Sequence, residues 1–92
     1  MPLGLYFNPD NFDTATYDEA LKRLEAAGAG APAGRLYHVA METDGKISVF
    51  DIWDSEESFA KFGETLVPIM AELGADPGQP MVSSVHNVIE GS

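Results

Sequence analysis

A chain of 92 residues, 45% of them hydrophobic, has room for one hydrophobic core, so we expect a single domain over residues 1–92. The formal net charge is −10 and the five Lys and Arg residues are scattered, which argues against nucleic acid and anionic membranes as partners. The absence of cysteine excludes thiol catalysis and Cys-ligated metals, and with no long apolar run it favours a cytoplasmic protein.

The first two predicted elements are a strand and an amphipathic helix. Residues 2–7 are rich in strand formers, and Asn-Pro-Asp at residues 8–10 ends the strand. Either Asp13 or Thr14 can cap the helix that follows. The residues at helical spacing, expected to face the core, are Tyr17, Leu21, Leu24 and Ala27 or Gly28. Residues 28–34 are rich in Gly and contain a Pro, so they predict a loop.

Residues 35–54 predict a β-hairpin. Asp44 and Gly45 suit the two positive-φ positions of a type I′ turn, and apolar residues alternate on both sides. Without a bulge, the cross-strand pairs are Thr43 with Lys46, Ala40 with Val49, His38 with Asp51, and Leu36 with Trp53. One face then carries Tyr37, Val39, Met41, Phe50 and Ile52, and the other carries Leu36, Ala40, Ile47, Val49 and Trp53. Both faces are apolar, so both need a cover.

The pair of His38 and Asp51 is the candidate catalytic site. It falls at a non-hydrogen-bonded position of the ladder, where side chains approach most closely. A carboxylate beside an imidazole can fix which ring nitrogen carries the proton, as a general base requires. Alternatively, the two residues form an ordinary cross-strand pair worth about 0.2–1 kcal/mol. Trp53 is either a substrate contact or a core residue, and His86 is a second candidate substrate contact whose facing stays open.

A second helix follows the hairpin. Asp54 or Ser55 can cap it, and two glutamates in its first turn suit the helix dipole. Its expected inner stripe is Phe59, Phe62, Leu66, Ile69 or Met70, and Leu73. Pro68 lies inside this stripe, so we expect a kink or a break into two segments near residues 65–67.

After a loop at residues 74–80, residues 81–90 predict the last strand. The order is then βαββαβ, which predicts a ferredoxin-like α+β fold: a four-stranded antiparallel sheet with both helices on one face. A second copy would most simply cover the other face, so we expect a homodimer. Which sheet face meets the helices is not decided by the pattern.

No pattern in the chain indicates a metal or a cofactor. The two histidines lack metal-ligand spacing, and the Gly-rich segment follows a helix instead of a strand, so it is no nucleotide-binding loop. We therefore expect neither a metal site nor a bound cofactor.

The segment VFDIWDSEESFAKF, residues 49–62, resembles the third strand and second helix of antibiotic-biosynthesis-monooxygenase-like proteins, within the dimeric α+β barrel superfamily. The likeness extends over nearly the whole chain. It implies a dimeric barrel, and relatives that include cofactor-independent quinone-forming oxygenases, haem-degrading oxygenases, isomerases, cyclases and members without known activity. Asn8 matches an Asn that oxygen-activating members use. Their Trp in the second helix is replaced here by Phe59 and Phe62, and residues 59–73 lack the haem-binding His.

Two classes of function follow. The first is a small-molecule enzyme, such as a cofactor-independent monooxygenase or a related isomerase or cyclase, acting on an aromatic or polyketide-like substrate. In it, His38 and Asp51 relay a proton, and the substrate contacts are Asn8, Trp53, Phe62 and His86. The second is a non-catalytic homodimeric binding or stress-associated module. A cavity beside His38 favours the first class, and a filled core favours the second.

Overall fold

The structure is a computed structural model that describes residues 2–76 and 78–91. Met1 and Ser92 of the expected domain, and Pro77 of the expected loop 74–80, lie outside the described residues. The elements in chain order are β1 (Leu3–Phe7), α1 (Thr14–Ala26), β2 (Arg35–Thr43), β3 (Lys46–Trp53), α2 (Glu56–Glu72) and β4 (Met81–Ser84).

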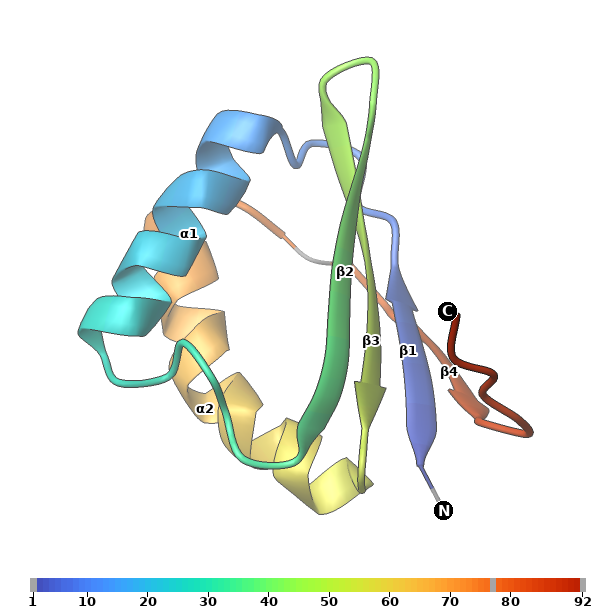
Figure 1. Cartoon of the computed structure of the whole chain (residues 1–92). Coiled ribbons are helices and arrows are strands. Elements are labelled where there is room, and N and C mark those ends of the chain that lie inside the picture. The colour runs from blue at the N-terminus through green and yellow to red at the C-terminus, as the bar shows by residue number, and fades with distance from the viewer. Residues whose placement is uncertain (1, 77, 92) are drawn as a thin grey trace.

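The four strands form one antiparallel sheet in the order β2-β3-β1-β4. Both helices lie on the same side of this sheet (Figure 1). The predicted ferredoxin-like fold is therefore confirmed. Because β1 and β3 are the central strands, β2 and β4 form the two edges of the sheet.

Both helices begin at capping side chains within the predicted alternatives. The Asp13 carboxylate accepts the backbone N–H of Thr16 at 2.8 Å, and the Ser55 hydroxyl accepts that of Ser58 at 3.2 Å. Each cap satisfies an N–H group that has no partner within its helix.

The predicted break in the second helix is wrong, because α2 runs without interruption through Pro68. Pro68 removes the N–H that would bond to the carbonyl of Glu64, and both residues are exposed, so water can satisfy that carbonyl. On the inner side, Leu66 and Met70 pack into the core on either side of Pro68.

The inner face of α1 differs from the predicted one in one residue. Ala20 and Leu24 are buried, whereas Leu21 is 38% exposed. The helix is rotated so that the small Ala20 faces the sheet. Leu21 therefore lies at the edge of the space between helix and sheet instead of in the core.

The hairpin turn and most of its register are confirmed. Asp44 and Gly45 have φ angles of 51° and 84°, as a type I′ turn requires. The pairs Thr43 with Lys46, Ala40 with Val49, and His38 with Asp51 all form. The register near the turn is thus set by the turn itself.

The expected pair of Leu36 and Trp53 is wrong. A β-bulge lies between Arg35 and Tyr37, so Arg35 is opposite Trp53 and Leu36 is 52% exposed. Such a bulge inserts an extra residue in one strand and turns the residues beyond it to the other face. It directs Arg35 toward the helices.

The last strand is shorter than predicted, since β4 ends at Ser84 instead of residue 90. The pairing of β4 with β1 ends at Ser84 opposite Leu3, and the last backbone bond beside it runs from the Val85 N–H to the Pro2 carbonyl. Residues 85–91 leave the ladder. The Tyr37 hydroxyl on β2 donates to Glu90 at 3.3 Å, so this segment reaches back to the opposite edge of the sheet.

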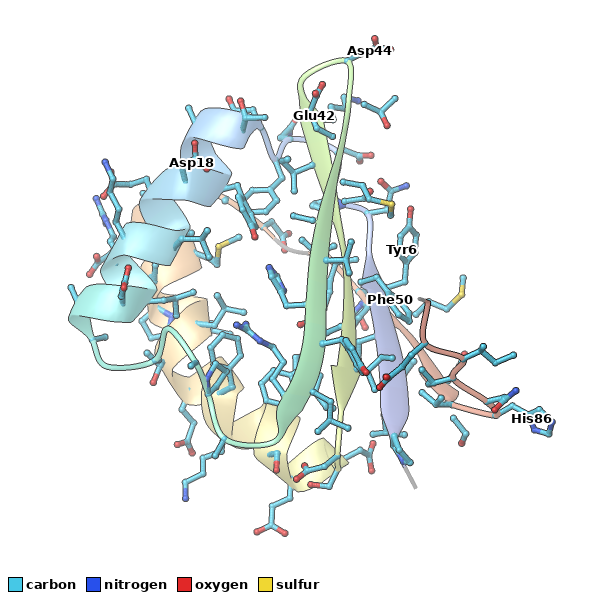
Figure 2. The ribbon with its side chains drawn as sticks, in the orientation of Figure 1. Tyr6, Asp18, Glu42, Asp44, Phe50 and His86 are labelled. Carbon is cyan, nitrogen blue, oxygen red and sulfur yellow. The ribbon has the colours of Figure 1, made fainter. Side chains whose placement is uncertain are left out.

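The core lies between the sheet and the helices, in two adjoining clusters. Their buried members are Phe12, Ala20, Ile47, Val49 and Met70 in one, and Leu5, Leu24, Trp53 and Phe62 in the other. The opposite face of the sheet exposes Tyr37, Val39, Met41 and Phe50, each by more than a third. Figure 2 shows Tyr6 and Phe50 on the side of the sheet away from the helices.

The start of the hairpin is held against α2 by Gly34. Its carbonyl accepts the N–H of Asp54 at 2.8 Å, and its φ of 92° lies in the left-handed region. A Cβ at this position would lie 2.5 Å from the Ser58 side chain. Only glycine fits both the conformation and the space.

We expect Gly34→Ala to lower the free energy of unfolding by about 2 kcal/mol or more, because it combines a backbone penalty with a clash. Gly63→Ala is the matched control. Gly63 lies within α2 and a Cβ there meets no atom, so alanine should raise the stability by about 0.5–1 kcal/mol. Urea denaturation at one protein concentration measures both. Equal midpoints for the two variants would contradict this account of Gly34.

Candidate functional site

A cavity lies between the helices and the sheet face they cover. Residues of β1, both helices and the hairpin line it, and the centre of a water molecule can reach about 70 Å³ of the space inside it. The wall is mostly apolar and includes the rings of four phenylalanines. The lining residues with polar side chains are Tyr17, Arg35, His38 and Asp51. An apolar pocket with a few convergent polar groups is the usual form of a small-molecule site.

A chain of three hydrogen bonds leads from the core to this cavity. The Trp53 indole N–H donates to Asp51 Oδ2 at 3.2 Å. Asp51 Oδ1 lies 2.6 Å from His38 Nδ1, and His38 Nε2 lies 2.7 Å from the Tyr17 hydroxyl. β3 supplies Trp53 and Asp51, β2 supplies His38, and α1 supplies Tyr17. The chain thus joins three elements that pack around the cavity.

Burial defines the role of each member. Trp53 is fully buried and Asp51 is 4% exposed, whereas the His38 side chain is 22% exposed. Within residues 2–76 and 78–91, no buried side-chain nitrogen or oxygen lacks a hydrogen-bond partner. Trp53 is therefore a core residue that holds the Asp51 carboxylate, and it does not line the cavity.

The donors and acceptors along the chain follow from their chemistry. The indole N–H can only donate, and an ionised Asp51 can only accept, so His38 Nδ1 carries a proton toward Asp51. In neutral His38, Nε2 then accepts the Tyr17 O–H. In the imidazolium form, Nε2–H donates to the Tyr17 oxygen instead. One proton can therefore pass between Tyr17 and His38 without any movement of the side chains.

Tyr17 is the member of the chain that α1 contributes, and it lies in the cavity wall. Burial raises the pKa of its phenol above the ordinary value of 10.0; the charges of Asp51 and Asp18 act in the same direction, and Arg35 opposes them. Tyr17 is therefore a protonated phenol at neutral pH. Its ring lies parallel to that of His38, with the planes 3° apart and the centroids 6.0 Å apart.

Arg35 is the cation of the cavity wall. Its guanidinium carbon lies 5.7 Å from the centre of the Phe62 ring, within range of a cation–π contact, and Nη2 donates to the Gly30 carbonyl at 3.3 Å. Simple alternation from the turn would place Arg35 on the outer face. The bulge between Arg35 and Tyr37 is the reason for its inward position.

The structure gathers some of the predicted site residues and separates others. His38, Asp51 and Phe62 line the cavity, and Trp53 supports Asp51 from the core. Asn8 is exposed and does not line the cavity, although its neighbours Phe7 and Pro9 do. His86 is exposed on the C-terminal segment and points away from the sheet in Figure 2.

Tyr17 and Arg35 are site residues that the sequence interpretation did not single out. Part of a signal for Tyr17 existed, since it was expected on the inner face of its helix, but the sheet face that this helix covers was left open. Arg35 had no such signal, because no local pattern marks the bulge. In the part of the chain that the structure describes, no group of three or more His, Cys, Asp or Glu side chains could hold a metal ion.

No protein-family model and no curated protein matches the sequence, but solved structures do. A putative antibiotic biosynthesis monooxygenase from Chloroflexus aurantiacus has a TM-score of 0.66 and 19% identity, over 98% of both chains. SnoaB, a cofactor-independent oxygenase from Streptomyces nogalater, has a TM-score of 0.63 and 12% identity, over 98% of this chain and 96% of that one. A Streptomyces coelicolor monooxygenase from the gene ActVA-Orf6, in complex with nanaomycin D, has a TM-score of 0.52 and 21% identity, over 99% of this chain and 91% of that one.

These likenesses, with the order of the strands, define the class as ferredoxin-like α+β proteins. More particularly, the chain has the fold of the antibiotic-biosynthesis-monooxygenase-like proteins, as its resemblance over residues 49–62 indicated. At these identities the likeness concerns the fold, and the chemistry has to be argued from the site. No described helix has the length and apolar character needed to cross a membrane.

We expect Asp51→Asn to break the hydrogen-bonded chain. The asparagine oxygen can still accept the Trp53 N–H, but the NH₂ group that replaces the other oxygen is a donor and cannot accept the His38 Nδ1–H. The free energy of unfolding should fall by about 1–3 kcal/mol. The His38 proton should also move from Nδ1 toward Nε2, which nitrogen-15 NMR of the imidazole reports directly.

The exposed Asp18→Asn is the matched control, and His86 serves as an internal reference in the same spectra. Neither the stability nor the His38 signals should change much in Asp18→Asn. Unchanged His38 nitrogen shifts in Asp51→Asn would show that the carboxylate does not select the tautomer.

Proposed function

We propose that the cavity binds a planar aromatic or polyketide-like molecule, and that Tyr17, His38 and Asp51 move a proton to or from it. The reaction we propose is a cofactor-independent monooxygenation, or a related isomerisation or cyclisation. One observation carries the proposal: a hydrogen-bonded chain that begins at a buried carboxylate and ends at a phenol in an apolar cavity.

The shape and lining of the cavity favour an aromatic ligand. Phe7, Phe12, Phe59 and Phe62 contribute ring surfaces to its wall, on which a flat molecule can pack by its faces or edges. Few polar groups line the cavity, so each of them can fix the orientation of a bound ring system.

The relay would work through the Tyr17 oxygen. That oxygen donates its proton to His38 Nε2 and keeps lone pairs for an acidic O–H or C–H of the ligand. As the ligand proton passes to Tyr17, the Tyr17 proton passes to His38, and Asp51 stabilises the imidazolium that forms. Tyr17 is a neutral phenol before and after the step, which agrees with its raised pKa.

Loss of a proton makes an activated CH₂ group between aromatic rings electron-rich enough to reduce O₂. In the overall reaction, the carbon loses two hydrogens and gains one oxygen atom as a ketone, and the second oxygen atom leaves as water. The oxidant is O₂. The likeness in fold to SnoaB, a cofactor-independent oxygenase, supports this choice of reaction.

A specific observation favours the alternative, a non-catalytic binding module. The resemblance assigned oxygen activation to an Asn and to a Trp in the second helix, yet Asn8 is exposed and Phe59 and Phe62 take the place of the Trp. Such a protein would use the same cavity and release its ligand unchanged. Binding and turnover therefore have to be measured separately.

We expect the wild-type chain to accelerate O₂ uptake by 1,8-dihydroxyanthrone above its spontaneous oxidation. The variants Tyr17→Phe and His38→Gln should each lose about a hundredfold or more of that acceleration, because each breaks the proton relay. His86→Gln is the matched control for the second histidine of the chain and should retain the wild-type rate. Uptake is followed with an oxygen electrode.

Binding is measured in the same samples from the fluorescence of Trp53, the only Trp of the chain, which lies 5.3 Å from the Phe62 ring of the cavity wall. Quenching without accelerated O₂ uptake, by a ligand that is recovered unchanged, would establish the binding module and reject the oxygenase. If neither quenching nor accelerated uptake is observed, both proposals for the cavity are rejected.

We also propose that a second copy of the chain covers the outer face of the sheet. Tyr37, Val39, Met41 and Phe50 form a contiguous apolar surface there, each more than one third exposed. Monomeric proteins rarely leave large apolar patches of this kind in water. The result would be a homodimer with one cavity in each subunit, on the sides away from the interface.

We expect Val39→Glu to convert a dimer into a monomer, since it places a charge in the middle of this surface. The matched control is Val67→Glu. Val67 is also exposed, at 60%, but lies on α2 on the other side of the molecule. Sedimentation equilibrium measures the mass of each variant. A monomeric wild-type chain, or a Val39→Glu variant that stays dimeric, would contradict the proposed interface.

A further inference from the structure

We infer that the cavity selects an aromatic ligand that carries a carboxylate, and that Arg35 binds this carboxylate. The inference rests on the proposed binding of an aromatic molecule in the cavity and adds a charge to its definition. It does not depend on whether the ligand is then oxidised.

The position of Arg35 is the first observation. The bulge turns its side chain away from the outer face and into the wall of the cavity, where it spans from the Phe62 ring to the Gly30 carbonyl. A bulge that disrupts the end of a strand pair costs regular hydrogen bonds, and such bulges commonly redirect one side chain. Here the redirected side chain is a cation in a mostly apolar cavity.

The second observation is that the carboxylates near Arg35 do not engage it. Both oxygens of Asp51 are taken, one by His38 and the other by Trp53. Among the described residues, the Arg35 side chain forms no ion pair, and its one hydrogen bond is to the Gly30 carbonyl. By contrast, Arg23 on the outer side of α1 pairs with two glutamates.

The remaining N–H groups of the guanidinium determine the chemistry of the partner. They form a planar fork that matches the two oxygens of a carboxylate, and the charge makes such bonds stronger than those to a neutral amide. The apolar wall reduces competition from water and strengthens the attraction further. A ring carboxylate lies in or near the plane of its aromatic system, so it suits a ligand held between phenylalanine rings.

The polar groups of the cavity would then contact different parts of the ligand. Arg35 holds the carboxylate, while Tyr17, at the end of the hydrogen-bonded chain, meets the acidic O–H or C–H group. The net charge of −10 repels anions at long range, but salt screens that repulsion beyond about 8–10 Å under physiological conditions. Local contact with Arg35 therefore decides the preference.

The competing explanation is that Arg35 is purely structural. It packs on Phe62 and ties the loop before β2 through Gly30, and both contacts could serve stability alone. A structural role predicts that loss of Arg35 weakens every ligand equally. A role in binding the carboxylate predicts the loss of one preference, so a ratio of affinities separates the two.

The test uses two probes that differ at one group, 9,10-anthraquinone-2-carboxylate and the neutral 9,10-anthraquinone-2-carboxamide. Their dissociation constants are measured at about neutral pH by Trp53 fluorescence and by calorimetry. The variant is Arg35→Met, which keeps the length of the side chain and removes the charge. Arg23→Met, whose wild-type residue lies outside the cavity, is the matched control. Circular dichroism and the melting temperature establish that each variant is folded.

We expect wild type and Arg23→Met to bind the carboxylate about tenfold or more tighter than the carboxamide. In Arg35→Met the two affinities should become equal, with that for the carboxamide changed by less than about threefold. Arg35→Lys should recover part of the preference, since it restores the charge without the planar fork.

Three results would overturn the inference: no preference in wild type, a preference that persists in Arg35→Met, or an equal loss of affinity for both probes in a folded Arg35→Met. If the wild type binds neither probe, both the proposed aromatic site and the inference are overturned. A preference for the carboxylate without accelerated O₂ uptake would instead support the inference and count against the oxygenase.

Discussion

The geometry of the site depends on a carboxylate buried in the core. Asp51 is 4% exposed, and a buried charge of this kind is costly unless hydrogen bonds satisfy it. Trp53 and His38 supply those bonds, so both side chains must face the helices from their strands. A shift of the hairpin by one residue would bury a different set and leave Asp51 on the apolar outer face. The same bonds that satisfy the charge therefore fix the register and orient His38 toward Tyr17.

The part of the site that local sequence patterns determine could be predicted from the sequence. Asp44 and Gly45 set the turn, and regular pairing from that turn leads to His38 opposite Asp51. Arg35 lies beyond the bulge, where counting fails. The conformation before it involves Gly34 packed against Ser58, a contact between segments far apart in the chain that no local pattern reveals.

The misplaced candidates have a similar explanation. Alternation along residues 81–90 assumed a strand of full length, but β4 ends at Ser84, so His86 falls outside the strand, where alternation does not determine its facing. Asn8 follows β1 in a turn, where alternation no longer determines facing. Tyr17 was expected on the inner face of the first helix, but the pattern did not decide which sheet face meets the helices, so its contact with His38 could not be predicted.

The two faces of β2 connect the cavity to the outer surface. β2 is an edge strand that pairs with β3 alone, and it carries His38 and Arg35 toward the helices while its neighbour Val39 faces outward. An edge strand without further cover is the part of a sheet most free to fray. A second copy packed on Val39 would hold β2 in place and thereby hold His38 and Arg35, without touching the ligand. In such a dimer, the outer surface would affect the chemistry indirectly, because it would make β2 more rigid.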